Sequence, residues 1–233
     1  MLESAESVRP VYLIVHGGFD GGWTWRDVAK RMWGAGAEVY CPSLTGLGDR
    51  THLMSQDVGL ETHIQDIVNV VIYSDLKDVI LVGHSYGGVV TTGVAQRIPE
   101  RLARVVYLDA VVLEDGENML DAVGEDFANW LTSRANELGD GWRVVHDPPD
   151  DDRKSDFPLL AAQERLSAAS VPAKELLHTF IRCTESGIPM LEEMATRARG
   201  RGWEYLEIES DHMPMLSVPQ EITSLLLSLQ DGV

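Results

Sequence analysis

Short apolar runs alternate with longer segments of helical periodicity along most of this chain. The runs are rich in Val, Ile, Leu and Tyr, as expected of strands buried on both faces of a sheet. We predict strands at Val11–Val15, Glu38–Cys41, Val79–Val82, Val105–Leu108, Leu176–Cys183 and Trp203–Ile208. Helices are predicted near residues 23–35, 59–74, 86–98, 189–200 and 218–230. This alternation predicts an α/β fold, with a mostly parallel sheet of about six strands and helices on both faces.

One connection departs from the alternation. Between residues 111 and 175 no strand pattern recurs, and the stretch contains Trp130 and the acidic run Asp147–Asp156. Structureless connections of this length are uncommon in a compact domain. We therefore expect an α/β core of residues 1–110 and 176–233, and a small helical cap of residues 111–175 over one end of the sheet. The acidic run is interpreted as a solvated loop of the cap and not as a metal site.

The composition narrows the range of partners. The 233 residues are 44% hydrophobic, enough for one sizeable core, and 19 Lys and Arg against 37 Asp and Glu give a net charge of −18. Phosphate backbones and anionic lipids repel such a chain, so we expect no nucleic-acid or membrane partner. No run approaches the ~18 apolar residues of a spanning helix, and the polar first ten residues lack a signal core. We expect a cytoplasmic protein and leave a homodimer open.

The chain has two cysteines, Cys41 and Cys183, and both fall in predicted strands. Two thiols exclude a disulfide framework and cannot complete a four-ligand zinc site alone. We interpret them as buried structural thiols. No metal or cofactor is expected.

The segment Val79–Val90 carries the most informative motif. It reads VILVGHSYGGVV, in which a buried strand enters a G-x-S-x-G turn around Ser85 and an apolar helix follows. This is the setting of a nucleophile elbow, where a tight turn lifts the serine hydroxyl out of the sheet end. The helix directs its unpaired N–H groups and positive dipole end at the same place. Ser85 is the predicted nucleophile, and the alternative is a glycine-rich turn with a passive serine.

A second strand–glycine–helix segment, VYLIVHGGFDGGW, spans Val11–Trp23. A carbonyl under nucleophilic attack becomes an oxyanion. Two fixed backbone N–H donors lower that barrier, and loss of one typically costs ~3 kcal/mol. We assign these donors to the amides of Gly18 and Tyr86. A phosphate cradle is disfavoured because no Lys-Ser/Thr pair follows and G-x-G-x-x-G is absent.

Seven histidines compete for the role of general base. His212 lies in ESDHMPM, just after the last predicted strand and before the last predicted helix. Loops at that edge of a doubly wound sheet collect site residues, and the order serine, acid, histidine is that of α/β-hydrolases. We predict His212 as the base. We expect His52 to line the pocket and His84 to point away from Ser85, and we interpret the remaining histidines as structural: His16, His63, His146 and His178.

The sequence identifies the acid that orients the imidazole less clearly than it identifies the serine and the histidine. Asp109 ends the fourth predicted strand in VVYLDAVV, where a buried carboxylate is costly unless it has a partner. Glu185 follows the fifth strand in IRCTESGI and is the rival, while Asp211, next to His212, is expected to point away. We favour Asp109, for which the other interpretation is a helix N-cap or turn residue.

These segments together resemble the α/β-hydrolase superfamily, specifically its small serine-esterase and hydroxynitrile-lyase branch. The matching stretches are HGGFDGGW, PSLTGLGDRTH, VGHSYGG, YLDA and DHMPMLSVPQ. Plant methyl esterases of this branch carry an Asp where this chain has Ser186. Some haloalkane dehalogenases take their acid from the strand end at which Asp109 stands. Hydroxynitrile lyases of the branch have a Thr and a Lys where this chain has Gly17 and Met213, so two groups that distinguish the lyases are missing.

We therefore predict a serine hydrolase that cleaves a small, neutral, hydrophobic or aromatic carboxylic ester through an acyl-enzyme. The alternatives are a carbamate or lactone hydrolase, a lyase-like enzyme, or a non-catalytic ligand receptor on the same fold. Arg50 is the nearby basic group. Pocket residues are expected among the apolar and aromatic neighbours of the motifs, namely Phe19, Tyr86, Val111, Leu113, Trp130 and Met213.

Overall fold

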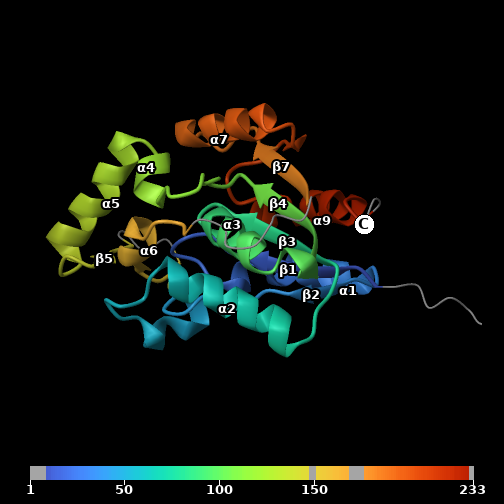
Figure 1. Ribbon diagram of the computed structural model, residues 1–233, viewed down its shortest axis with the longest axis horizontal. Coiled ribbons are helices and arrows are strands. Elements are labelled where there is room, and N and C mark those ends of the chain that lie inside the picture. Colours follow the sequence, from blue (N-terminus) through green and yellow to red (C-terminus); the bar gives the residue numbers. More distant parts are fainter. Residues whose placement is uncertain (1–8, 147–150, 168–175, 231–233) are drawn as a thin grey trace, which may run out of the picture.

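The computed structural model describes residues 9–146, 151–167 and 176–230. Its central sheet has the order β2-β1-β3-β4-β7-β8, and every neighbouring pair is parallel (Figure 1). The strands are β1 (Val11–Val15), β2 (Glu38–Tyr40), β3 (Val79–His84), β4 (Leu102–Leu108), β7 (Leu177–Cys183) and β8 (Glu204–Ile208). The predicted α/β fold is confirmed. The strand ends shift by a few residues, as at β4, which begins at Leu102 instead of Val105.

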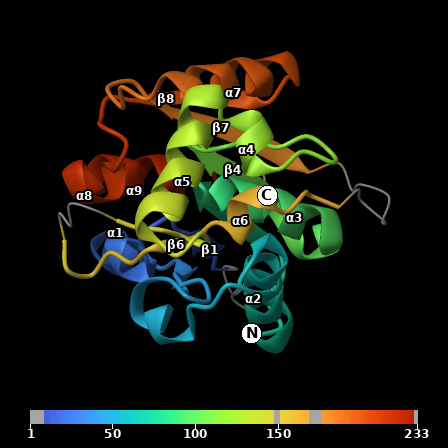
Figure 2. The ribbon, with the colours of Figure 1, turned by 90° about the vertical axis from the view of Figure 1, so that its left-hand side faces the viewer.

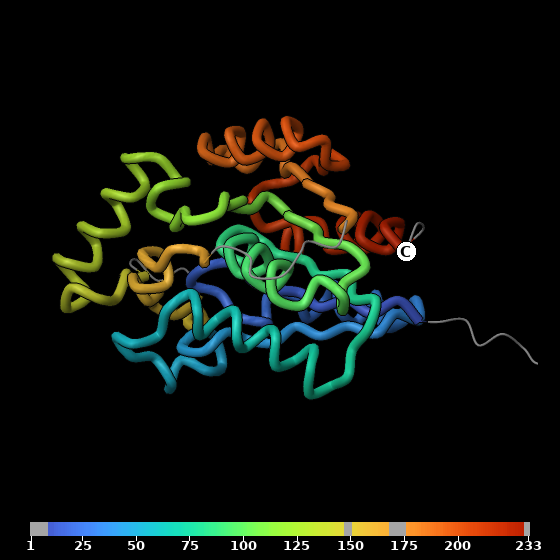
Figure 3. The backbone as a smooth tube through the Cα atoms, in the orientation of Figure 1, coloured from blue at the N-terminus to red at the C-terminus, as the bar shows by residue number. Residues whose placement is uncertain are grey.

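Helices cover both faces of this sheet (Figures 1 and 3). They are α1 (Arg26–Gly34), α2 (Leu60–Tyr73), α3 (Gly87–Arg97), α7 (Pro189–Gly200), α8 (Pro214–Ser217) and α9 (Pro219–Ser228), with 3-10 turns at Gly22–Trp25, Gly48–Leu53 and Pro99–Arg101. Successive strand side chains point to opposite faces. On β1, Leu13 joins the apolar core with α2, α3 and α7, whereas Tyr12 and Ile14 join the core with α1 and α9. The continuous apolar runs of the sequence therefore reflect burial from both sides.

The described parts of the chain between β4 and β7 lie over one end of the sheet (Figures 1 and 2). It forms α4 (Met119–Ala122), α5 (Glu125–Leu138), α6 (Leu160–Gln163) and an antiparallel pair, β5 (Arg143–Val144) with β6 (Phe157–Pro158). The expectation that this stretch has no strand is wrong, because strands of two residues are too short to leave a periodic pattern. The division into a core of residues 1–110 and 176–233 and a cap of residues 111–175 stays a prediction.

Several smaller expectations concern polar groups. Residues 147–150 of the acidic run lie outside the described residues, and Asp156 at its end pairs with Arg143 at 2.9 Å. In the described ranges, no group of three or more His, Cys, Asp or Glu side chains could hold a metal, and no helix is long and apolar enough to cross a membrane. Both thiols are free, but Cys41 is half-buried where a buried thiol was expected. Burial raises the pKa of Cys41 and of Cys183 to about 12, so both stay protonated at neutral pH.

Candidate active site

Ser85 occupies the turn between the end of β3 and the start of α3. Its φ of 52° lies in the left-handed region, which is strained for a residue with a side chain. Hydrogen bonds from the neighbouring chain hold this turn: Ser85 N donates to Leu108 O at 3.3 Å, and Ser85 O accepts from Val111 N at 3.1 Å. Glycine is required beside it, because a Cβ at Gly83 would lie 2.6 Å from Gly87 O. The result is a partly exposed serine on a tight strand–turn–helix bend, the geometry of a nucleophile elbow.

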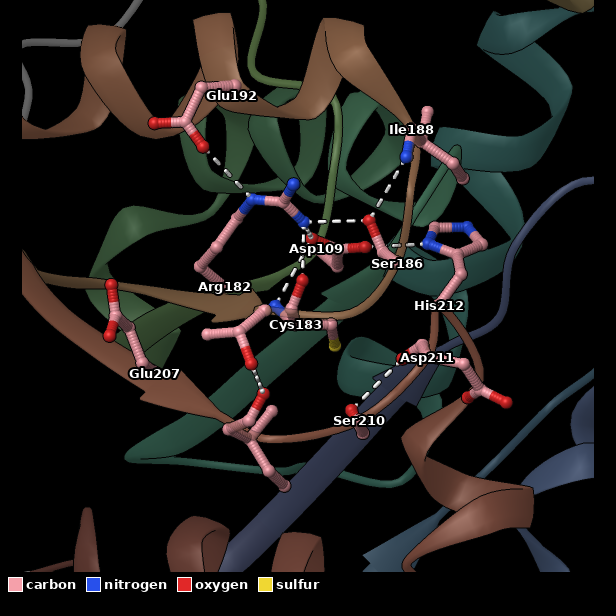
Figure 4. A network of polar contacts seen from close by, with 12 residues as sticks. Asp109, Arg182, Cys183, Ser186, Ile188, Glu192, Glu207, Ser210, Asp211 and His212 are labelled. Atoms are coloured by element: carbon pink, nitrogen blue, oxygen red, sulfur yellow. Dashed lines mark hydrogen bonds and ion pairs between the residues drawn. The ribbon is translucent and has the colours of Figure 1, made fainter.

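His212 lies in the loop between β8 and α8, and its Nδ1 is 2.8 Å from Oδ2 of Asp109 (Figure 4). Asp109 follows β4 directly, is fully buried, and has a strained φ of 41°. Its Oδ1 accepts hydrogen bonds from Arg182 and from Cys183 N, the latter at 3.3 Å. Burial raises the pKa of Asp109, but the hydrogen bonds and charges of His212 and Arg182 outweigh burial and leave this pKa below its ordinary value. Asp109 is thus an ionised acceptor for the imidazole.

The two rival carboxylates are placed differently. Glu185 is exposed, and its backbone N donates to Ser210 O at 2.9 Å. Asp211 turns away from the imidazole, as expected, and its Oδ1 accepts from Met213 N at 2.9 Å (Figure 4). Of the carboxylates weighed from the sequence, Asp109 is the one that the structure brings to His212.

The amides of Gly18 and Tyr86, predicted to bind an oxyanion, lie on two neighbouring loops and both residues line the same cavity as Ser85 and His212. Tyr86 directly precedes α3, where the helix dipole favours negative charge. Its buried ring is held by a hydrogen bond of 2.8 Å from its hydroxyl to His63 Nδ1. Burial lowers the pKa of His63 to about 4, so the neutral ring accepts at Nδ1 and donates from Nε2 to Thr45 O at 2.9 Å.

Two more buried histidines support the site. His84 donates from Nε2 to the backbone oxygen of His212 at 2.8 Å, with 4.7 Å between the ring centroids. His16 accepts at Nε2 from Leu44 N at 3.0 Å and donates from Nδ1 to Gly17 O at 2.7 Å, which fits its structural interpretation. Burial lowers the pKa of His16 to about 4 and that of His84 to about 3, so both rings are neutral. Sequence reasoning missed the contact between His84 and the His212 loop, because these residues are 128 positions apart.

A cavity of about 570 Å³ opens beside Ser85 and His212. The expected pocket residues Phe19, Trp130 and Met213 all line it. The sequence did not point to several other residues that line this cavity. These lie in the β4–β7 connection or at the start of α7 and include Met119, Phe127, Leu131, Phe157, Ile188 and Met190.

Some pocket expectations are wrong. Val111 and Leu113 are buried in the apolar core, since they follow the strand end into the layer between sheet and helices. Arg50 forms an ion pair with Asp66 at 3.1 Å, which holds it among polar groups. His52 is exposed, and His146, interpreted as structural, lines the cavity. Local sequence near a motif did not show which way these side chains turn.

Aromatic rings form one side of the cavity. We call Phe19, Phe127, Trp130, His146 and Phe157 the aromatic wall. Phe19 has a φ of 67° and lies centrally, with ring centroids 5.5 Å from His146, 5.7 Å from Phe157 and 6.3 Å from Trp130. Phe127 stacks on Trp130 at 5.4 Å. The loop after β1 and the β4–β7 connection thus meet through ring contacts.

The chain matches known proteins in sequence and in fold. The model of the Alpha/beta hydrolase family matches residues 12–225. A carbendazim hydrolyzing esterase of Nocardioides sp. (strain SG-4G) is 49% identical over 109 residues, 47% of this chain and 45% of that protein. Putative methylesterase 13, chloroplastic, of Arabidopsis thaliana is 25% identical over 98% of this chain and 57% of that protein. The matches thus span about half the length of these two relatives.

Among solved structures, an extracellular alpha/beta-hydrolase from a Paenibacillus species superposes with a TM-score of 0.82 at 20% identity, over 94% of this chain and 98% of that one. At this identity the likeness concerns the fold. The family match covers nearly all of the described residues, and the six-stranded parallel sheet agrees with it. This chain belongs to the alpha/beta hydrolase family.

Proposed function

We propose that this chain is a serine hydrolase in which Ser85, His212 and Asp109 form the catalytic triad. The observation that carries the proposal is the pairing of His212 with the fully buried Asp109 at 2.8 Å, because His212 and Ser85 line the same cavity. With Nδ1–H donated to Asp109, His212 has its Nε2 lone pair free to accept a proton. An elbow serine without a paired histidine would be a passive turn residue.

The reaction follows from these roles. Ser85 Oγ attacks the ester carbonyl carbon while its proton passes to His212, and the carbonyl oxygen becomes an oxyanion bound by the amides of Gly18 and Tyr86. The carbon–oxygen bond to the alcohol then breaks, and protonated His212 gives its proton to the departing alcohol. Water, deprotonated by His212, then attacks the acyl-enzyme. The bond from the acyl carbon to Ser85 Oγ breaks, protonated His212 returns its proton to Oγ, and the acid is released. Asp109 stabilises the imidazolium in both halves of the cycle.

The cavity supports a neutral substrate with an aromatic or hydrophobic group. Ring side chains line it, and its size suits a small organic ester. A side chain at Gly17 would begin 3.1 Å from the Ser85 Cβ, so glycine there keeps space open beside the nucleophile. We place the acyl carbonyl next to this space and the aromatic part of the substrate against the aromatic wall.

A fluorophosphonate probe tests the nucleophile. In the folded protein it should label Ser85, and turnover of 4-nitrophenyl butyrate should fall about 10⁴-fold or more in Ser85→Ala. Ser55→Ala, a change in an exposed loop, is the matched control and should keep full turnover. A folded protein that neither takes up the probe nor hydrolyses any of a panel of neutral esters would refute the proposal and favour a ligand receptor.

A carbamate is the second candidate substrate class. The relative with 49% identity over its matched segment is named for the hydrolysis of carbendazim, a methyl carbamate of a planar bicyclic ring. Such a ring would stack on the aromatic wall in the same way as an aromatic ester. The test compares kcat/KM for a methyl arylcarbamate and for the methyl ester of the same ring. Chromatography follows the arylamine released from the carbamate and the aryl carboxylic acid released from the ester. A higher value for the carbamate would make it the preferred class.

A further inference from the structure

A buried guanidinium lies on the opposite side of Asp109 from His212. Arg182 donates a hydrogen bond to Oδ1 of Asp109, whereas His212 Nδ1 lies 2.8 Å from Oδ2 (Figure 4). The two oxygens of one carboxylate thus have separate partners. We propose that Arg182 is a positioning residue for the reaction, which anchors Asp109 and limits the negative charge that Asp109 offers to His212. This inference rests on the serine-hydrolase function proposed above.

Arg182 has several contacts that fix its orientation. On β7 its side chain is 10% exposed, and Asp109 is fully buried, so solvent screens their interaction weakly. The Nη1 group that binds Asp109 also donates to Cys183 O at 2.7 Å and to Ser186 Oγ at 2.8 Å. Because the guanidinium is planar and fixed by several acceptors, it also fixes the carboxylate that it binds. The free oxygen of Asp109 therefore faces the imidazole in one orientation.

The charged and titratable groups around Asp109 and His212 come from five parts of the chain, of which β7 contributes Arg182. Asp109 follows β4, and His84, neutral because burial lowers its pKa to about 3, ends β3. Asp211 precedes His212 in the same loop and turns away from it. On α7, Glu192 lies 3.6 Å from Arg182 Nε with a side chain that is 62% exposed. Within this set, the buried charges are Asp109 and Arg182.

The positive charge of Arg182 opposes the uptake of a proton by His212. His212 must be neutral to accept the Ser85 proton, and Arg182 shares with the imidazolium the negative charge of Asp109. Removing this charge should let Asp109 hold the imidazolium more tightly. The acid limb of the kcat/KM profile should then move to higher pH by about one pH unit. If Arg182 were merely structural, its removal would lower the free energy of unfolding and leave the acid limb of the kcat/KM profile in place.

Arg182→Gln and Arg182→Lys separate charge from geometry. For Arg182→Gln we expect the acid limb to rise by about one pH unit and the plateau of kcat/KM to fall about ten- to a hundredfold, because Asp109 loses its anchor. Lys keeps the charge but not the planar fork. Arg182→Lys should therefore keep the limb of the parent enzyme and lose plateau activity severalfold.

Arg104→Gln is the matched control. Arg104 lies on β4, five residues before Asp109, and is also buried. It forms an ion pair with Glu204 and donates a hydrogen bond of 2.7 Å to Thr179 Oγ1. Its loss removes a buried arginine of the same sheet, and we expect a lower Tm with an unmoved pH profile. An Arg182→Gln variant with the Tm loss of Arg104→Gln and an unmoved acid limb would overturn the proposal.

A further readout covers the case in which Arg182→Gln does not fold. Arg182→Lys then decides, because full parent activity in that variant would mean that the guanidinium geometry contributes nothing. Fluorophosphonate labelling of Ser85 in the parent protein keeps the two proposals apart. If labelling succeeds and the Arg182 variants behave as the parent enzyme does, the positioning role is wrong while the serine-hydrolase function stands. If labelling fails, the function itself is wrong.

Discussion

The two sides of the cavity differ in how they are held in place. On one side His212 lines the cavity after β8, and its hydrogen bond to the fully buried Asp109 after β4 fixes it. On the other side the aromatic wall is held by ring contacts, and Trp130 is 42% exposed. Directional bonds permit one geometry, whereas ring contacts allow the side chains to shift. We infer that the first side sets the chemistry and the second side sets which substrates bind.

Exchange of the acid tests this comparison most severely. Asp109→Asn should lower kcat about 10⁴-fold with little change in KM, because the amide no longer holds the catalytic tautomer of His212. Glu185→Gln, at the rival and exposed position, should stay within about twofold of the parent enzyme. Steady-state kinetics with 4-nitrophenyl butyrate give both values. Mild effects in both variants would indicate a Ser–His dyad and remove Asp109 from the mechanism.

Acid pH should lower the stability of the fold through the buried histidines around the hydrogen-bonded side of the cavity. Burial lowers the pKa of His16 and of His63 to about 4 and that of His84 to about 3, from 6.5 in the unfolded chain. The unfolded chain therefore binds more protons, and the free energy of unfolding falls as the pH drops below 6.5 towards these values. We expect a loss of several kcal/mol between pH 6.5 and 5.

The measurement is urea unfolding across that pH interval. Asp109, whose pKa is lowered, adds to the loss at still lower pH, because its ionised form stabilises the fold above the unfolded pKa near 3.8. Stability that stays constant from pH 7 to 5 would show that these imidazoles gain protons without cost. The assignment of these three histidines as neutral in the folded protein would then be wrong.

Truncation of the aromatic wall should change binding more than chemistry. Phe19→Ala and Trp130→Ala should each raise KM for an aromatic ester about tenfold, since ring contacts and apolar burial are lost. For an acetate ester of a small aliphatic alcohol the change should be within about twofold. Trp33→Ala, an exposed tryptophan on α1, is the control. A drop in kcat with an unchanged KM would place Phe19 with the catalytic residues instead.

Removal of one hydroxyl should give the smallest effect. Tyr86→Phe deletes the hydrogen bond to His63 Nδ1 and leaves a buried acceptor unsatisfied, which should lower the free energy of unfolding by about 1–2 kcal/mol. Because the oxyanion donor is the backbone amide of Tyr86, kcat should fall less than about threefold. Chemical denaturation and ester kinetics check these two values. A loss of kcat of a hundredfold would mean that the hydroxyl itself meets the substrate.

The sequence alone was informative about the fold and about the local motif. Runs such as Val11–Val15 are buried on both faces, and this burial leaves a continuous apolar pattern that predicts a parallel strand. The β5–β6 pair leaves no such pattern, because two residues per strand make a single period of alternation, which cannot be seen to repeat. The elbow around Ser85 was recognisable because its strand, turn and helix are adjacent in the chain.

Contacts between distant segments could be found only in the tertiary structure. Asp109 and Glu185 both follow strands in the sequence, and only the packing of β4 between β3 and β7 brings Asp109 to His212, 103 residues away. The packing of neighbouring strands also brings Arg182 to Asp109 and buries Val111 in the apolar core. Local periodicity depends on the residues next to each other in the chain. Which side chains meet at the sheet edge depends on how the crossovers pack, and no short segment contains that information.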